Sequence, residues 1–313
     1  MSFAVFDAHC DTMQKITDFG GSLRENNYHL DLKRIHNLKG NYIQIFAAFV
    51  NKKQDALPPF LRAGQIINRY FEEIDRNSGL IEHCINLKQI EETMNMGKTV
   101  SLLGIEGGEA IEGSLEKLNE FYNAGVRIMT LCWNYSNEIC DGIDEERGAG
   151  LTGFGKSVVS EMNRLGMLID VSHISERGFW DVVETSKSPV AATHSNAKAI
   201  THHRRNLDDE QIKAIIKCGG CIGVNFYSDF ISDGKCSIKD LLNHIEHVLA
   251  LGGEDALGLG SDFDGMDSLP CEIMGVEDIY KVFEEMQRIG YSDFLINKIS
   301  SGNFLKLMQK ILL

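Results

Sequence analysis

The sequence predicts an α/β fold, a (β/α)8 TIM barrel, from two observations. Short apolar runs alternate with amphipathic stretches along the chain, which is typical of a parallel sheet with crossover helices. Eight such runs occur, and most are apolar throughout, as expected for parallel strands that are buried on both faces. An open, doubly wound sheet is the alternative arrangement of the same elements.

The predicted strands are bounded by turn residues. The clearest two begin after Gly166 and Pro189, and each ends on a histidine, His173 or His194. The eight predicted strands are residues 3–9, 42–50, 100–106, 127–133, 167–173, 190–194, 222–226 and 257–261.

The predicted helices lie between the strands and after the last one. Gly125 and Gly166 stand where helices should stop, a position that favours glycine. The predicted helices are residues 60–76, 115–123, 156–165, 176–185, 208–217, 238–251, 276–288 and 293–312. The first strand precedes a longer excursion over residues 12–40, and the connections 52–59 and 134–152 are candidate lid or pocket loops.

Composition narrows the class of protein. The 313 residues show no repeat or linker, so we expect a single barrel domain over residues 1–313. A net charge of -14 argues against a nucleic-acid partner. No run reaches the length of a membrane span, and the N-terminus predicts a strand rather than a signal peptide, so we expect a cytoplasmic protein. Its eight cysteines are then reduced thiols, and the Cys218–Cys221 pair predicts a plain turn.

Potential metal ligands follow several predicted strands. The active site of such a barrel lies at the carboxyl ends of its strands, so side chains there should meet. They are His9 and Asp11 after the first strand, Glu106 after the third, His173 after the fifth, His194 after the sixth, and Asp262 and Asp264 after the eighth. Imidazole and carboxylate suit Zn²⁺, Mn²⁺ or Fe²⁺, and two such ions are typical of metal hydrolases.

Each residue also has a plainer interpretation. A single histidine at a strand end is usually a hydrogen-bonded polar residue, and Asp11 or Glu106 alone could cap a helix or form a salt bridge. The other histidines fall away from strand ends, and His244 and His247 are expected on a helix surface. Residues 150–157 match the P-loop pattern G-x-x-x-x-G-K-[ST], but the acidic stretch before them does not predict the strand that a P-loop requires.

The order and spacing of several motifs resemble one family. They are residues 7–11, 104–108, 150–173, 193–195, 203–206, 260–265 and 301–305. On these motifs, over essentially the full length, the chain resembles the membrane dipeptidase (renal dipeptidase) family of zinc peptidases, in its bacterial branch.

The resemblance implies a binuclear zinc site, although the ligand types leave other divalent metals open. His9 and Asp11 would bind one Zn²⁺, His173 and His194 the other, and Glu106 would bridge them. A hydroxide held between the two ions would attack the peptide bond of a dipeptide. In addition to these five ligands, the resemblance assigns acid/base catalysis to Asp262 and binding of the substrate's C-terminal carboxylate to Arg205.

One departure from the family concerns Trp133, which stands where the animal enzymes have a histidine that contacts the substrate carbonyl. Tryptophan can donate one hydrogen bond but cannot carry a proton. The preferred substrate is therefore open. A related binuclear amidohydrolase acting on another small amide, ester or lactone is the alternative function. A P-loop nucleotide-binding protein, based on residues 150–157, is a distant alternative. Homodimers are common in the family, and the acceptance of D-residues is left open.

Overall fold

Eight parallel strands close into a barrel in the computed structural model, which describes residues 3–312. Their sheet order is β2-β1-β9-β8-β7-β6-β5-β4, and pairing of β2 with β4 closes the ring. This closure confirms the predicted barrel and excludes the open sheet. The strands are β1 (Val5–Cys10), β2 (Tyr42–Phe49), β4 (Thr99–Glu106), β5 (Val126–Thr130), β6 (Leu168–Asp170), β7 (Val190–Ala192), β8 (Cys221–Val224) and β9 (Leu257–Leu259).

Several strands are shorter than predicted. β6 and β7 have three residues each, so His173 and His194 lie just beyond them. The cause is Asp170 at the end of β6, whose Oδ1 accepts hydrogen bonds from the backbone N–H groups of Ser172 and Thr193. These two amides are therefore bound to a side chain, and the chain leaves the sheet early.

A ninth strand, β3 (Ile81–His83), and the helix α4 (Leu87–Asn95) after it were not predicted. β3 pairs with residues 99–101 of β4, whereas β5 pairs with residues 103–106 of the same strand. The sequence Ile-Glu-His has no apolar run, so it carries no strand pattern. The prediction that His83 lies away from strand ends is therefore wrong.

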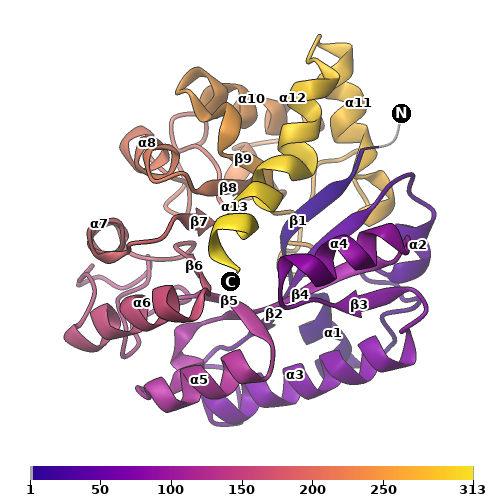
Figure 1. Cartoon of the computed structure of the whole chain (residues 1–313). Helices are drawn as coiled ribbons and strands as arrows, with labels where there is room; N and C mark the ends of the chain where they lie inside the picture. The colour runs from indigo at the N-terminus through magenta and orange to yellow at the C-terminus, as the bar shows by residue number, and fades with distance from the viewer. Residues whose placement is uncertain (1–2, 313) are drawn as a thin grey trace.

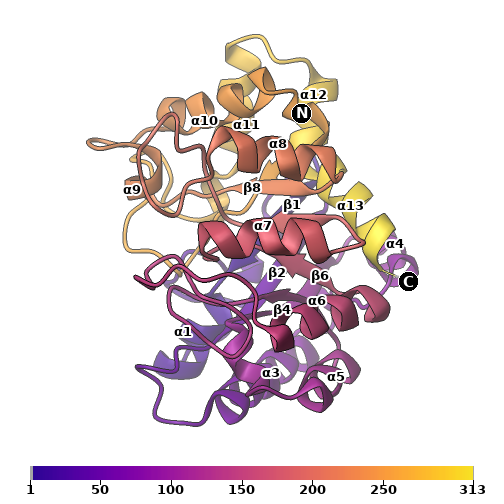
Figure 2. The same cartoon turned by 90° about the vertical axis from the view of Figure 1, so that its left-hand side faces the viewer.

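The helices surround the barrel in the predicted alternation (Figures 1 and 2). Side-chain caps define where many of them begin: Asp208 and Gln211 form a capping box on α8, and Ser237 and Asp240 form one on α10. The helices are α1 (Thr12–Phe19), α2 (Leu32–His36), α3 (Pro59–Arg76), α5 (Leu115–Asn123), α6 (Gly153–Leu165), α7 (Glu176–Thr185), α8 (Asp209–Lys217), α9 (Ser228–Ile231), α10 (Ile238–Ala250), α11 (Tyr280–Arg288), α12 (Asp293–Asn297) and α13 (Asn303–Ile311).

Shorter helical turns complete the chain. The predicted helix 293–312 consists of α12 and α13 joined by a π-helical turn, and the predicted helix 276–288 begins with a 3₁₀ turn. The π-helical turn is Lys298–Gly302, and the 3₁₀ turns are Gly108–Ile111, Gly253–Asp255 and Val276–Asp278. No helix within residues 3–312 combines the length and the apolarity that a membrane crossing requires.

The C-terminal helix α13 lies across one end of the barrel (Figure 1). The ring of Phe304 on α13 stacks on that of Phe6 from β1, with 5.2 Å between centroids. Gly258 permits this approach, because a Cβ there would lie 2.3 Å from the Phe304 ring. Ile45 and Leu102 belong to the same apolar cluster inside the barrel. Apolar side chains therefore fill the end of the barrel that α13 covers. The polar side chains described below lie at the other end.

Candidate metal centre and active site

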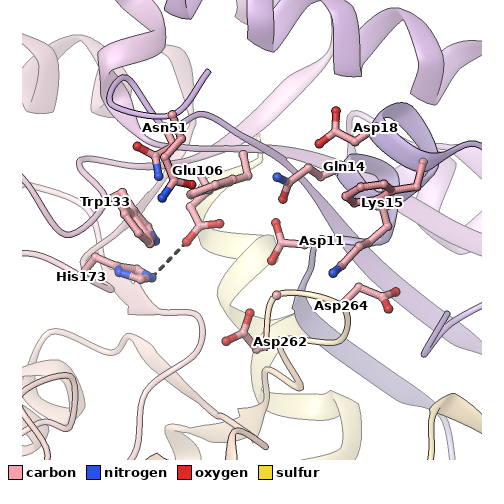
Figure 3. A pocket seen from close by; sticks show the side chains of 14 residues that line it. Asp11, Gln14, Lys15, Asp18, Asn51, Glu106, Trp133, His173, Asp262 and Asp264 are labelled. Atoms are coloured by element: carbon pink, nitrogen blue, oxygen red, sulfur yellow. Dashed lines mark ion pairs between the residues drawn. The ribbon is translucent and has the colours of Figure 1, made fainter. Parts of the chain in front are cut away.

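The five predicted metal ligands meet at the open mouth of the barrel. Figure 3 shows three of them, Asp11, Glu106 and His173, where they line a cavity. His9 is delivered by β1 and Glu106 by the end of β4, whereas Asp11, His173 and His194 follow β1, β6 and β7. All five are buried or nearly so, although residues far apart in sequence supply them. The structure therefore brings together the five ligands that the resemblance implied, whereas Asp262 and Asp264, which also follow a predicted strand, join no ligand group within residues 3–312.

The ligand atoms form two groups that share Glu106. In the first, Nε2 of His9 lies 3.5 Å from Oδ2 of Asp11 and 3.3 Å from Oε2 of Glu106. In the second, Nε2 of His173 and Nε2 of His194 lie 3.0 and 3.7 Å from Oε1 of Glu106. The two oxygens of one carboxylate thus face different pairs of ligands, which is the arrangement that a bridging carboxylate requires.

The hydrogen bonds of two histidines direct their Nε2 atoms into the site. Nδ1 of His173 lies 2.7 Å from Oδ1 of Asn134, so Nδ1 donates. The Thr193 hydroxyl donates its only hydrogen to Asp170, and it therefore accepts from Nδ1 of His194 at 2.8 Å. Both rings then present an unprotonated Nε2, and these two atoms are 2.8 Å apart. Partners of this kind typically orient metal-binding histidines.

Charge and burial in the site fit bound cations. Burial lowers the pKa of both His173 and His194 well below the usual value, so the rings are neutral. Burial, reinforced by the nearby Asp11, raises the pKa of Glu106 to about 7. Burial opposes protonation of His9, but the carboxylates of Glu106 and Asp11 outweigh it and raise its pKa well above the usual value. The donor set therefore attracts positive charge, either protons or metal ions.

Two buried polar atoms also indicate that the site fits metal ions. Nε2 of His9 and Oδ1 of Asp11 have no hydrogen-bond partner among residues 3–312, although both are shielded from solvent. Buried polar atoms are normally satisfied, so such atoms in a converging set of ligands indicate that an ion completes them. The residues present thus suit a metal centre.

Asp170 forms a third possible ligand group with His9 and His194, because their ligand atoms lie within 4.8 Å of one another. Its two oxygens, however, accept five hydrogen bonds, from the hydroxyls of Thr130, Ser172 and Thr193 and from two backbone amides. We therefore assign Asp170 to positioning the strand ends rather than to metal binding.

The backbone at the site is strained. His173, Asp262 and Asp264 have positive φ angles of 67°, 61° and 71°. Such conformations cost on the order of 1–3 kcal/mol each and persist where the surroundings impose them. Gly265 shows how tightly the carboxylates are packed, because a Cβ there would lie 2.3 Å from Asp11 and 2.4 Å from Asp262.

Asp262 lies beside the ligands without joining either group. Its Oδ1 is 3.9 Å from Nε2 of His9, and its Oδ2 accepts a hydrogen bond of 2.9 Å from the amide of Asn225. Burial raises the pKa of Asp262 to about 7, with a further contribution from the negative charge of Asp11. A carboxyl group with this pKa can both accept and donate a proton near neutrality.

Arg205 is buried, at 7% exposed, rather than placed in a surface salt bridge. Its Nη2 donates to the backbone oxygen of His194 at 3.3 Å, which holds the guanidinium against the second ligand group. Its Nε is buried without a hydrogen-bond partner in the described chain. A buried guanidinium with a free N–H is suited to an anionic group of a ligand.

A cavity of about 330 Å³ opens onto the ligands (Figure 3). Trp133 forms part of its wall, where its ring packs edge-on against Phe49 with 5.3 Å between centroids and lies 6.0 Å from the ring of His173. α1 contributes another part of the wall through Gln14 and Lys15. Trp133 thus occupies a place next to a metal ligand, but as a wall of the cavity.

Two other sequence patterns carry no chemistry here. The P-loop match is preceded by turns rather than a strand, and a Cβ at Gly155 would lie 2.2 Å from the backbone oxygen of Ile139. Cys218 ends α8 and Cys221 begins β8, as predicted, and burial raises the pKa of Cys221 to about 12.

His244 corrects another prediction, that it lies on a helix surface. It is 1% exposed, with Nδ1 accepting from the backbone of Ala197 and Nε2 lying 3.0 Å from the oxygen of Ile231. It is a buried structural residue, because its face of α10 also carries Leu241 and Val248 toward the core.

Four residues that position side chains of the site were not predicted: Asn134, Asp170 and Thr193 at the ligand groups, and Asn225 at Asp262. Asp170 was the most accessible from sequence, because a carboxylate inside the apolar run 167–171 needs buried partners. Asn134 lies in a loop segment, where an amide has no distinguishing pattern. Asn225 lies at the end of the predicted strand 222–226, just beyond the last residue of β8.

Comparisons with known proteins agree with this geometry. A family model described as membrane dipeptidase (peptidase family M19) matches residues 1–312. An uncharacterized protein of the pqqA 5′ region of Klebsiella pneumoniae is 33% identical over 249 residues, covering 76% of this chain and 92% of that protein. An uncharacterized dipeptidase of Schizosaccharomyces pombe is 35% identical over 227 residues, covering 69% of this chain and 54% of that protein, so the match spans about half of the yeast relative.

Solved structures give the same picture. A metallopeptidase of Rhodobacter sphaeroides, liganded with a phosphinate mimic of the dipeptide L-Ala-D-Ala, superposes with a TM-score of 0.92 at 27% identity, covering 99% of this chain and all of that one. A dipeptidase AC of family M19 also gives 0.92, at 28% identity, covering 100% of this chain and 99% of that one. On the full-length family match and these relatives, the chain belongs to the membrane dipeptidase family of metallopeptidases.

Proposed function

We propose that the protein hydrolyses the peptide bond of dipeptides with two zinc ions at the barrel mouth. The observation that carries this proposal is the division of the ligands into two groups that share Glu106. His9 and Asp11 would hold one ion, and His173 and His194 the other. When bound, the two ions would lower the pKa of a shared water, so that hydroxide is available at neutral pH, and would polarise the scissile carbonyl.

The chain's own residues supply the proton transfer. Asp262 is close to His9 and is held through Oδ2 by Asn225, which leaves Oδ1 directed to the ligand groups. Oδ1 would take the proton of the attacking water and give it to the leaving amine. The raised pKa of Asp262 suits this double role, and bound cations would bring this pKa down toward the ordinary range of a carboxyl group.

Arg205 would limit the substrate to dipeptides. Its guanidinium is held beside His194, so a carboxylate paired with it would place the carbonyl of the preceding residue at the ligands. A longer peptide would place an amide, which has no negative charge, against this buried cation. The ligand of the Rhodobacter sphaeroides relative mimics L-Ala-D-Ala, so a D-residue at the second position is worth testing here as well.

Trp133 supports a second candidate function. Because it cannot carry a proton where the animal enzymes have histidine, the preferred substrate could be another small amide, ester or lactone. A cytoplasmic location of the protein and its assembly into a homodimer stay predictions. A small dipeptide remains the proposed binding partner.

The first experiment is elemental analysis of the purified protein, with L-Ala-L-Ala, L-Ala-D-Ala and Leu dipeptides assayed before and after chelation. About two zinc ions per chain and chelator-sensitive cleavage, restored by zinc, support the proposal. Bound metal without dipeptide cleavage would favour the amide, ester or lactone substrates. A protein that binds no divalent metal would contradict the proposed centre.

A further inference from the structure

The wall that α1 adds to the cavity carries a cation, the ammonium of Lys15. Lys15 is half-buried and lines the cavity together with Gln14. Its ammonium forms no ion pair within 4.0 Å among residues 3–312, and it lies 5.9 Å from the centroid of the Phe19 ring. A half-buried ammonium without a counter-ion is unusual in a cavity that is otherwise lined with carboxylates.

The carboxylates near Lys15 are already engaged. Asp18, one turn further along α1, pairs with Nη2 of Arg62 at 2.7 Å. Asp264 accepts hydrogen bonds from the hydroxyl of Thr12 at 2.5 Å and from the backbone of His29 at 2.9 Å. Asp11 belongs to the metal-ligand groups. The charge of Lys15 is therefore available to a molecule in the cavity.

Lys15 and Arg205 lie on different sides of the ligand groups. Arg205 is bonded to the backbone of His194, and it borders a small pocket that His173 separates from the main cavity. Lys15 extends from the helix that follows Asp11, on the side of the cavity opposite His173 (Figure 3). A dipeptide with its C-terminal carboxylate on Arg205 and its scissile carbonyl at the ligands would direct its N-terminal residue toward α1.

We propose that Lys15 selects dipeptides whose N-terminal residue has an acidic side chain. This inference rests on the proposed function and deepens it, because it names the substrate class of the same site. The side-chain carboxylate would pair with the ammonium of Lys15, and the amide of Gln14 can donate a hydrogen bond to the same group. No described ion pair has to be broken for this pairing.

The test compares L-Glu-L-Ala with L-Gln-L-Ala, which have the same size and differ in charge. The wild type should show a kcat/KM about 10- to 100-fold higher for L-Glu-L-Ala, the range expected for a hydrogen bond between charged groups. K15M, which keeps the aliphatic stem, should bring the ratio close to one, and K15E should invert it. K156M, at an exposed position of α6, is the matched control and should keep the wild-type ratio.

Several results would overturn the proposal. One is a wild-type ratio near one, and another is a K15M variant that keeps the wild-type ratio. A third is an effect of K15M on L-Ala-L-Glu against L-Ala-L-Gln instead, which would put the second residue at α1. If no dipeptide is cleaved with any metal, the proposed function fails, and calorimetric binding of L-Glu-L-Ala and L-Gln-L-Ala decides the role of Lys15. Tighter binding of the acidic dipeptide, lost in K15M, would support it, and equal binding would refute it.

Discussion

The side-chain oxygen of Asn134 lies 2.7 Å from Nδ1 of His173, across 39 residues of sequence. Asn134 comes from the loop after β5 and His173 from the end of β6, so this contact joins two strand ends. It fixes both the tautomer of the His173 ring and its direction, since Nδ1 must donate. The positive φ of His173 shows that the backbone is also held in a costly conformation to aim this ring.

We expect Asn134→Ala to weaken metal binding about 10- to 100-fold, the usual effect of removing a partner that orients a histidine ligand. Titration of the metal-free protein against a chromophoric chelator measures this change directly. Asn297→Ala, at an exposed position of α12, should leave the affinity unchanged. An Asn134→Ala variant with wild-type affinity would show that His173 is held by its backbone alone.

Glu106→Gln should remove one arm of the shared carboxylate, because an amide offers a single oxygen and no charge. Metal content should fall below two ions per chain and activity by at least about 100-fold, since two ions can no longer be bridged. Elemental analysis and dipeptide assays test this, with Glu116→Gln on the exposed side of α5 as the control. Two tightly bound ions with full activity would rule out the bridging role.

Asp262→Asn separates acid/base catalysis from metal binding. Because Asp262 belongs to neither ligand group, the variant should keep its metals while kcat falls about 10²- to 10⁴-fold. The amide also keeps the size of the side chain that Gly265 accommodates. Loss of metal in this variant would make Asp262 a ligand rather than the proton carrier.

The strand-end argument predicted which side chains meet because it needs only the order of elements. Glu106 ends an apolar run, and His173 and His194 end two neighbouring runs, so a parallel barrel must bring them to one mouth. The exact lengths of β6 and β7 could not be predicted. The backbone N–H groups of Ser172 and Thr193, just after these strands, bond the side chain of Asp170 instead of a neighbouring strand. The hydrogen bond to Thr193 joins two strands, and local sequence does not encode such a contact.

Contacts made by loop residues could not be predicted from the sequence either. Asn134 lies in a segment that the sequence predicted only as a long loop, and its partner became known only from the fold. His244 illustrates the opposite error, since its helix is apolar on a wide face and buries a histidine that the pattern placed at the surface. The element type was therefore predictable where periodicity is strong, whereas individual polar partners were not.

His83 gives a stability prediction that is independent of the metal centre. Its Nδ1 lies 2.8 Å from the hydroxyl of Tyr70, and its Nε2 faces Gly125 so closely that a Cβ there would be 2.4 Å away. Burial, aided by the positive charge of Arg127, lowers the pKa of His83 to about 4 from the usual 6.5. Between these values the unfolded chain binds a proton that the folded protein does not, so stability rises with pH.

The contribution of His83 should therefore be complete above about pH 6.5 and should be lost as the pH falls toward 4, by on the order of 2 kcal/mol. Urea unfolding of the metal-free protein at pH 7 and pH 4.5 measures the difference. His83→Gln, which can still bond Tyr70, should lose less stability over this interval than the wild type. His202→Gln, at an exposed position, should lose as much as the wild type. Equal losses in all three proteins would mean that His83 is protonated in the folded state, because solvent reaches its ring beside Tyr70.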